Sequence, residues 1–263
     1  MPPTVASSLA DAGIDALACK PASMDPREAS TLGVELLAVD YEGREHVPPS
    51  DLLADLAEGI DIRLTVPIRA DGYDPLGDDS LLASVPDSVG LVAVAGNPAY
   101  LDGTERSRAV APRLRTLVDG ATDPWVGSEG IERIAMVVGG TQYDLLSGRT
   151  ERDARALRAA GFTGGLAVYA PAVFSDEPDA ILDAVGRYAG RRRPVRRALP
   201  DDCTLSSAVT GEARETLLAA CRDYALVGEE DTVARQVDQL TAAGVDRIVA
   251  YPARGIDVPD TAT

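Results

Sequence analysis

Two charged side chains stand where apolar segments end, and both could take part in chemistry. Lys20 follows the apolar run 16–19, and Asp40 follows the run 36–39. Lys20 is the only lysine beside 24 arginines, and its amine could form a Schiff base, act as a general acid or hold a phosphate. The alternative is a structural ion pair between Lys20 and the carboxylate of Asp40.

His46 is the only histidine of the chain and lies in the polar loop that follows Asp40. An imidazole can take up and release a proton near neutral pH, so we predict a catalytic role for His46 beside Lys20 and Asp40. The sequence gives His46 no partner, which leaves an exposed loop histidine as the alternative reading.

Two further segments could bind anions. Gly139, Gly140 and Thr141 follow a candidate strand and could present backbone N–H groups to a phosphate, although a plain tight turn explains them as well. Six arginines lie within residues 187–197, with Tyr188 as the only aromatic residue among them. This cluster could hold a phosphate, a polyanionic tail or RNA, or it could pair with acids of the protein's own surface or of a neighbouring subunit.

A short pattern, in which a helix ends at a glycine and a strand follows, recurs along the chain. We call this pattern a joint, and the strands it introduces must position the candidate site residues. In the last joint, Val233, Val237 and Leu240 form one apolar stripe, Gly244 ends the helix, and 246–251 reads as a buried strand. The strands are nearly continuous apolar runs, which is typical of parallel strands that are covered on both faces. The repeated joints therefore predict one parallel sheet with helices between its strands.

Eight candidate strands in 263 residues favour a single (β/α)8 TIM barrel over 1–263, with an irregular arginine-rich insertion near 190–210. An open parallel α/β sheet is the alternative. The candidate strands are 15–20, 35–41, 61–69, 90–96, 133–139, 164–170 and 246–251, with a seventh strand taken from either 195–199 or 224–227.

Composition narrows the class of protein. The net charge of −17, carried almost without lysine, resembles that of haloarchaeal proteins adapted to a salt-rich cytoplasm, and it argues against nucleic acid as a partner. Three unpatterned cysteines and no apolar run long enough to span a membrane also fit the cytoplasm. A single histidine excludes histidine-rich metal clusters, and no dinucleotide, Walker or Gly-x-Ser-x-Gly motif is present.

The segment ALVGEEDTVARQVDQLTAAGVDRIVAYP, residues 225–252, resembles the C-terminal signature of the bacterial luciferase-like superfamily. That family includes flavin monooxygenases and deazaflavin-dependent reductases. The resemblance implies a TIM barrel with FMN or an 8-hydroxy-5-deazaflavin coenzyme at the carboxyl ends of the strands. The family's usual His-Pro pair and Leu-Asp…Ser-x-Gly-Arg stretch do not occur in residues 70–90, which indicates a contracted member.

Three functions follow as hypotheses. The first is a flavin- or deazaflavin-dependent oxidoreductase acting on a small molecule. The second is a non-catalytic barrel that needs no such coenzyme and either binds a phosphate-bearing ligand or serves as a structural subunit, with homo-oligomers left open. The third is a lyase or aldolase built on Lys20. Besides Lys20, Asp40 and His46, the residues predicted to line the site are Arg69, Asn97, Gly139, Gly140, Thr141, Tyr169 and Arg254.

Overall fold

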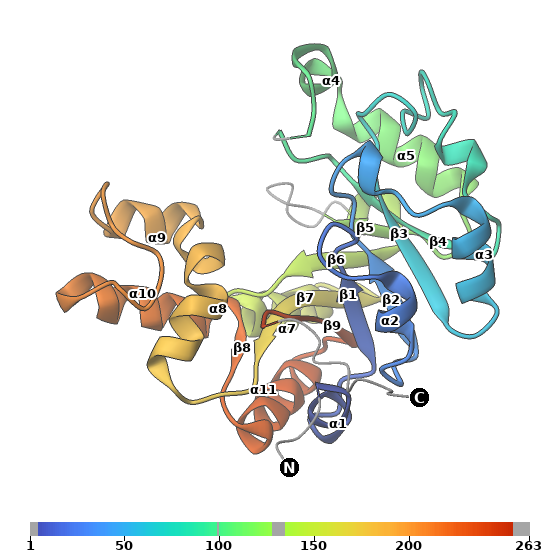
Figure 1. Cartoon of the computed structure of the whole chain (residues 1–263). Helices are drawn as coiled ribbons and strands as arrows, with labels where there is room; N and C mark the ends of the chain where they lie inside the picture. The colour runs from blue at the N-terminus through green and yellow to red at the C-terminus, as the bar shows by residue number, and fades with distance from the viewer. Residues whose placement is uncertain (1–4, 99, 128–134, 255–263) are drawn as a thin grey trace.

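The computed structural model describes residues 5–98, 100–127 and 135–254, which form a closed barrel (Figure 1). Consecutive barrel strands pair in parallel, and the last pairs back to the first, so the predicted (β/α)8 barrel is confirmed. The barrel strands are β1 (Ala16–Cys19), β2 (Leu36–Val39), β3 (Asp61–Pro67), β4 (Gly90–Val94), β5 (Trp125–Gly127), β6 (Thr141–Leu145), β7 (Leu166–Val173) and β9 (Arg247–Pro252).

Helices connect the strands and cover the outside of the barrel. Their apolar faces pack with the outward side chains of the strands in the largest core cluster of the protein. The helices are α1 (Val5–Asp11), α2 (Pro26–Ser30), α3 (Ser50–Ala57), α4 (Gly103–Ser107), α5 (Val110–Gly120), α6 (Ala135–Val138), α7 (Thr150–Ala159), α8 (Pro178–Gly190), α9 (Arg193–Ala198), α10 (Gly211–Tyr224) and α11 (Glu230–Ala242), with short 3-10 helices at Arg44–His46 (η1) and Leu82–Ser84 (η2).

The joint between α11 and β9 forms as the sequence predicts. Val233, Val237 and Leu240 are buried, and Gly244 leaves the helix with φ of +105°. The Asp246 carboxylate then accepts the backbone N–H of Leu166 at 2.7 Å, which ties the start of β9 to the start of β7. The segment 225–252 therefore encodes the strand that closes the barrel, since β9 pairs with both β1 and β7.

The predicted strand over 133–139 is wrong where the structure describes it. Residues 135–138 form helix α6, while 128–134 lie outside the described residues. The fifth and sixth strands are instead β5, only three residues long, and β6. A short apolar run does not distinguish a strand from a helix by its periodicity, which explains the error.

This correction also removes the need for a barrel strand between 190 and 228. Residues 195–198 belong to helix α9. Leu226 and Val227 form a two-residue strand, β8, that pairs with the end of β7 and lies outside the ring of eight strands. The predicted seventh strand is therefore not a barrel strand.

Between β7 and β9 the chain forms an arm of three helices, α8, α9 and α10. Figure 1 shows this arm projecting to one side of the barrel. It has a hydrophobic cluster of its own, in which Leu182, Val185, Leu217 and Cys221 are almost fully buried. The arm is thus a separately packed unit attached at the carboxyl end of β7.

Candidate functional site

Alternate side chains of the strands point into the barrel, and their sizes complement each other around it. On β1 these are Ala16 and Ala18, both fully buried. On β5, β6 and β7 they are the aromatic residues Trp125, Tyr143 and Tyr169. The small residues leave room for the rings, so aromatic side chains fill much of the barrel interior.

Lys20 follows β1 and continues the inward alternation at the carboxyl end of the barrel, which we call the mouth. Its ammonium lies 4.3 Å from the ring centroid of Tyr251 and 5.9 Å from that of Tyr169. The two rings are stacked, with centroids 6.4 Å apart. Within the part of the chain that the structure describes, no carboxylate oxygen lies within 4.0 Å of the ammonium, so the alternative ion pair with Asp40 does not form.

Asp40 follows β2 at the same mouth, where its carboxylate accepts a hydrogen bond from the Thr65 hydroxyl at 3.4 Å. Its charge acts on several buried groups around it. Burial raises the pKa of the Cys19 thiol to about 12, and Asp40 contributes to the rise. Burial also raises the pKa values of Tyr143 and Tyr169 well above their usual range, again with a contribution from Asp40.

Tyr143 is a site residue that the sequence does not reveal. Its side chain points inward from β6, and the residue is only 7% exposed. Its hydroxyl has no hydrogen-bond partner among the described residues. Leaving a buried hydroxyl unsatisfied costs about 1–3 kcal/mol, so this group is a candidate for binding a ligand. The predicted strand at 133–139 does not include Tyr143, so the sequence does not show that its side chain points inward from β6.

The arm adds a second aromatic group beside the mouth. The Tyr188 ring of α8 lies 6.4 Å from the Tyr169 ring of β7. The Arg192 guanidinium lies over Tyr188, 4.2 Å from its centroid, and 5.8 Å from that of Tyr224 on α10. Tyr188 therefore connects the rings of the barrel with the core of the arm.

His46 lies apart from this group. It stands in η1 with Nε2 3.8 Å from a carboxylate oxygen of Glu45. It borders a groove of about 520 Å³ between the loops that follow β1 and β2, with Met24 and Pro26 on the other side. Lys20 and Asp40 are not among the residues that line this groove, so the structure does not place His46 with them.

The side chain of Arg69 binds backbone oxygens of the protein itself. Its guanidinium donates hydrogen bonds to the backbone oxygens of Ala95 at 2.6 Å, Gly96 at 3.1 Å and Arg106 at 2.8 Å. Partial burial lowers its pKa. These bonds hold the end of β3 to the end of β4 and leave little of the guanidinium for a coenzyme.

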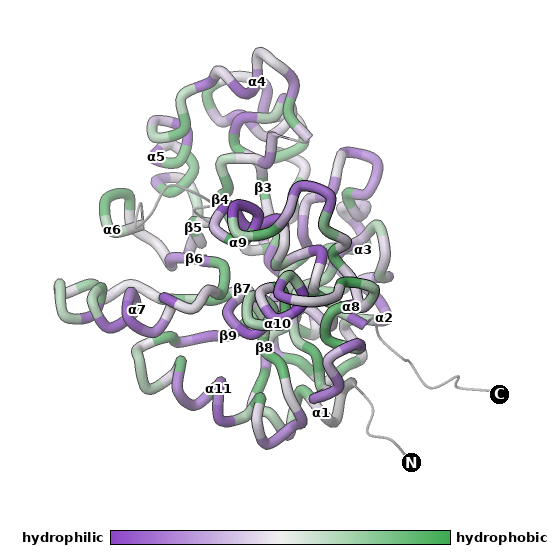
Figure 2. The backbone as a smooth tube through the Cα atoms, turned by 90° about the vertical axis from the view of Figure 1, so that its left-hand side faces the viewer, coloured by the Kyte–Doolittle hydropathy of each residue, from purple (hydrophilic) through white to green (hydrophobic). Residues whose placement is uncertain are grey.

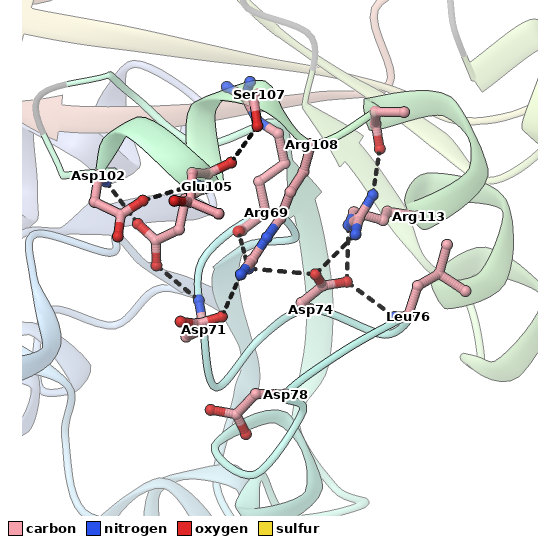
Figure 3. A network of polar contacts seen from close by, with 12 residues as sticks. Arg69, Asp71, Asp74, Leu76, Asp78, Asp102, Glu105, Ser107, Arg108 and Arg113 are labelled. Carbon is pink, nitrogen blue, oxygen red and sulfur yellow. Dashed lines mark hydrogen bonds and ion pairs between the residues drawn. The ribbon is translucent and has the colours of Figure 1, made fainter.

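The loops after β3 and β4 are joined by a wider polar network (Figure 3). Asp74 is 1% exposed and accepts two hydrogen bonds from Arg113, at 2.8 and 2.9 Å. Arg108 lies 3.3 Å from the same carboxylate and donates to Asp71 at 2.6 Å. Glu105 accepts the backbone N–H of Asp71 at 2.8 Å. The network makes one wall beside the mouth rigid.

Asn97 and Arg254 follow β4 and β9 at the carboxyl face, and both are exposed. The positive charge of Arg254 helps to lower the pKa of Asp183 on α8, although hydrogen bonds from Ser207 contribute more. Arg254 thus lies on the side of the barrel that bears the arm. Of the predicted residues, the structure brings Lys20, Asp40 and Tyr169 together.

The glycine turn lies at the opposite end of the barrel from Lys20, which corrects its predicted position. Gly139 and Gly140 precede β6 and Thr141 begins it, whereas the prediction placed all three after a strand. The Thr141 N–H donates to the Pro124 oxygen at 2.9 Å. A Cβ on Gly140 would lie 2.3 Å from that same oxygen. Close backbone approach therefore explains the glycine pair without a phosphate.

Replacing Gly140 by alanine should lower the free energy of unfolding by at least about 1–3 kcal/mol, because its φ of +90° is strained for any side chain and the Cβ clashes with backbone. Urea unfolding followed by circular dichroism measures the change. Gly120→Ala is the control, since a Cβ there meets nothing within 4 Å and φ is not positive. Equal stability of the two variants would contradict this explanation of the turn.

The described residues contain no group of three or more histidine, cysteine, aspartate or glutamate side chains placed to hold a metal ion. None of their helices is long and apolar enough to cross a membrane.

The fold and the mouth define a closed (β/α)8 barrel with its polar groups at the carboxyl ends of the strands. The chain belongs to a family of unknown function, DUF7388, whose model matches residues 9–258. Comparison with curated proteins gives no match. Among solved structures, the chain is similar to an F420-dependent secondary alcohol dehydrogenase in complex with an F420-acetone adduct, with 11% identity, a TM-score of 0.60, and coverage of 91% of this chain and 94% of that one. At this identity the similarity shows a shared fold, the closed (β/α)8 barrel.

Proposed function

We propose that this protein is an oxidoreductase that binds a deazaflavin coenzyme or FMN at the mouth of its barrel and acts on a small molecule. The observation that carries the proposal is the convergence of Lys20, Asp40 and the Tyr143 hydroxyl, which has no partner among the described residues, on one aromatic-lined mouth. A cation, a carboxylate and a buried phenol suit a flat, polar ring system. The fold shared with an F420-dependent dehydrogenase supports this choice of coenzyme.

Each group of the mouth has a defined task in this proposal. The Tyr143 hydroxyl stays protonated at neutral pH, because burial raises its pKa, and it donates a hydrogen bond to the bound ring. The Lys20 ammonium, held on Tyr251, attracts an anionic or carbonyl oxygen of the ligand. The Asp40 carboxylate accepts a proton or a hydrogen bond. The coenzyme itself supplies the hydride chemistry.

Calorimetric titration of the purified protein with F420 and, separately, with FMN tests the proposal. We expect saturable binding of one coenzyme with one site per chain. If both titrations show no heat of binding while the protein remains folded by circular dichroism, the coenzyme proposal fails.

Lys20→Met should weaken coenzyme binding by about tenfold or more, because it keeps the stem but removes about 1.4 kcal/mol of attraction to the ligand. Arg27→Met is the matched control, since Arg27 is an exposed cation in α2, the helix that follows β1. Lys20→Arg should recover part of the affinity. Equal affinities of the wild-type protein and Lys20→Met would remove Lys20 from the site.

The environment of Lys20 also favours a second candidate, a lyase or aldolase that forms a Schiff base. The amine has no carboxylate within 4.0 Å among the described residues and lies against two aromatic rings. Borohydride added with a panel of small aldehydes and ketones would trap such an adduct as a secondary amine. Because Lys20 is the only lysine, its peptide alone, apart from the chain's amino terminus, should gain mass. No gain in mass on that peptide would reject this candidate.

A further inference from the structure

The end of α8 and helix α9 carry a dense positive surface. Six arginines fall within residues 187–197, and no acidic residue occurs from 184 to 200. Figure 2 shows α9 as a strongly hydrophilic part of the projecting arm. Five of the six are exposed, and we call them the arginine face: Arg187, Arg191, Arg193, Arg196 and Arg197.

The arginine face is not neutralised by the residues that the structure describes. None of its five side chains has a hydrogen bond or ion pair with a residue that the structure describes. Some exposed arginines elsewhere are paired, as Arg115 is with Asp119 at 2.8 Å and Arg155 is with Glu151 at 3.1 Å. An acidic protein thus leaves its densest positive surface without partners in the described part of the chain.

The arm holds this face in a fixed position. Val195 and Leu199 are buried in the core of the arm, so the outward side of α9 is defined by its packing. Arg192, between the exposed arginines, lies over the rings of Tyr188 and Tyr224. The packing of α9 therefore fixes where these side chains leave the helix, and each guanidinium can bind a carboxylate as a planar fork.

The same arm carries unpaired acids next to the arginine face. Asp201 and Asp202 follow α9, and Glu212 and Glu215 lie on α10. All four are exposed, and none has an ion pair with a described residue. Both signs of charge therefore remain unsatisfied on one projecting element. In a two-fold dimer, a patch that contacts a second patch is itself contacted by it, so two such arms can satisfy each other.

We propose that the arm is a self-association surface, on which the arginine face of one copy binds the acids of α10 and of residues 201–202 in a second copy. Without the six arginines, the chain has 19 basic and 42 acidic residues, a net charge of −23. Such a surface repels nucleic acid and other phosphate polymers around the face. A second copy, in contrast, supplies carboxylates beside every arginine face.

Sedimentation equilibrium of the full chain, over a range of protein concentrations at moderate salt, tests the proposal. We expect a wild-type dimer that dissociates as salt rises. The triple variant Arg193→Glu, Arg196→Glu, Arg197→Glu and the double variant Glu212→Arg, Glu215→Arg should each be monomeric. Combining all five substitutions should restore the dimer, because the charges are exchanged. Arg152→Gln with Arg155→Gln on α7 is the control and should leave the dimer unchanged.

Several results would overturn the proposal. A wild-type monomer at all concentrations would do so, as would a dimer that persists in both charge-reversal variants. A combined variant that remains monomeric would also contradict the pairing of the arginine face with these acids. Binding of wild-type protein to heparin without dimer formation would assign the arginine face to a phosphate or sulfate polymer instead. Thermal unfolding by circular dichroism confirms that each variant is folded, and Arg→Gln at the same three positions replaces the triple variant if it is not.

Discussion

We expect Tyr143→Phe to raise the free energy of unfolding of the ligand-free protein by about 1–3 kcal/mol and to weaken coenzyme binding. The gain arises because the substitution removes a buried hydroxyl that has no partner among the described residues, while the ring stays in place. Coenzyme affinity falls because the same hydroxyl donates a hydrogen bond to the coenzyme in the proposed site. Opposite effects on stability and affinity are typical of a residue kept for function.

Chemical denaturation and coenzyme titration on the same variant measure both effects. Tyr100→Phe is the matched control, since Tyr100 is 46% exposed and its hydroxyl can be hydrated. That variant should change neither quantity. A Tyr143→Phe protein that is less stable than the wild type would show that the hydroxyl is satisfied in solution, and the argument for a ligand at this position would fail.

We expect Asp74→Asn to lower the free energy of unfolding by about 3–5 kcal/mol, because it leaves the partly buried guanidinium of Arg113 without its carboxylate and removes one of the two carboxylates that Arg108 contacts. Arg113 and Arg108 both contact Asp74, and their side chains are only 14% and 20% exposed. Asp119→Asn removes an exposed i,i+4 pair with Arg115 and should cost less than about 1 kcal/mol. Similar losses in the two variants would show that the network of Figure 3 contributes little to stability.

The pH dependence of stability gives Asp74 a second signature. Burial alone would raise its pKa, but hydrogen bonds from Arg113 and the Leu76 N–H, with the charges of both arginines, lower it below the usual 3.8. A lowered folded-state pKa means that the stabilisation is complete above about pH 4 and is lost as the pH falls through the folded value. The wild-type protein should therefore lose more stability than Asp74→Asn when the pH is reduced from 5 to 3.

The barrel is predictable from the sequence because its joints are local. In the α11–β9 joint, one apolar stripe, one glycine and one acid determine the helix, its end and the start of the strand. The same logic places Lys20 and Asp40 at the carboxyl ends of β1 and β2. Prediction from local pattern fails at β5, whose three residues are too few to show any period. This error places the glycine turn at the wrong end of the barrel.

The rest of the site depends on contacts between distant segments. Tyr143 becomes informative only when its hydroxyl is seen to be buried and unpaired, and nothing local indicates that. Tyr188 meets Tyr169 only because helix α8 of the arm packs against β7. Arg69 looks like an anion-binding residue in sequence, yet backbone oxygens from two later segments occupy its guanidinium. Such tertiary partners cannot be deduced from residue type and spacing.

The fluorescence of Trp125 during titration with F420 and with FMN tests the central claim most directly. Trp125 is the only tryptophan, and it lies inside the barrel in the cluster that contains Tyr143 and Tyr169. A coenzyme at the mouth would therefore be close enough to accept its excitation energy. We predict saturable quenching by one coenzyme, with one site per chain. Unchanged Trp125 emission with both coenzymes, beyond simple absorption by the ligand, would contradict a coenzyme site at the mouth of the barrel.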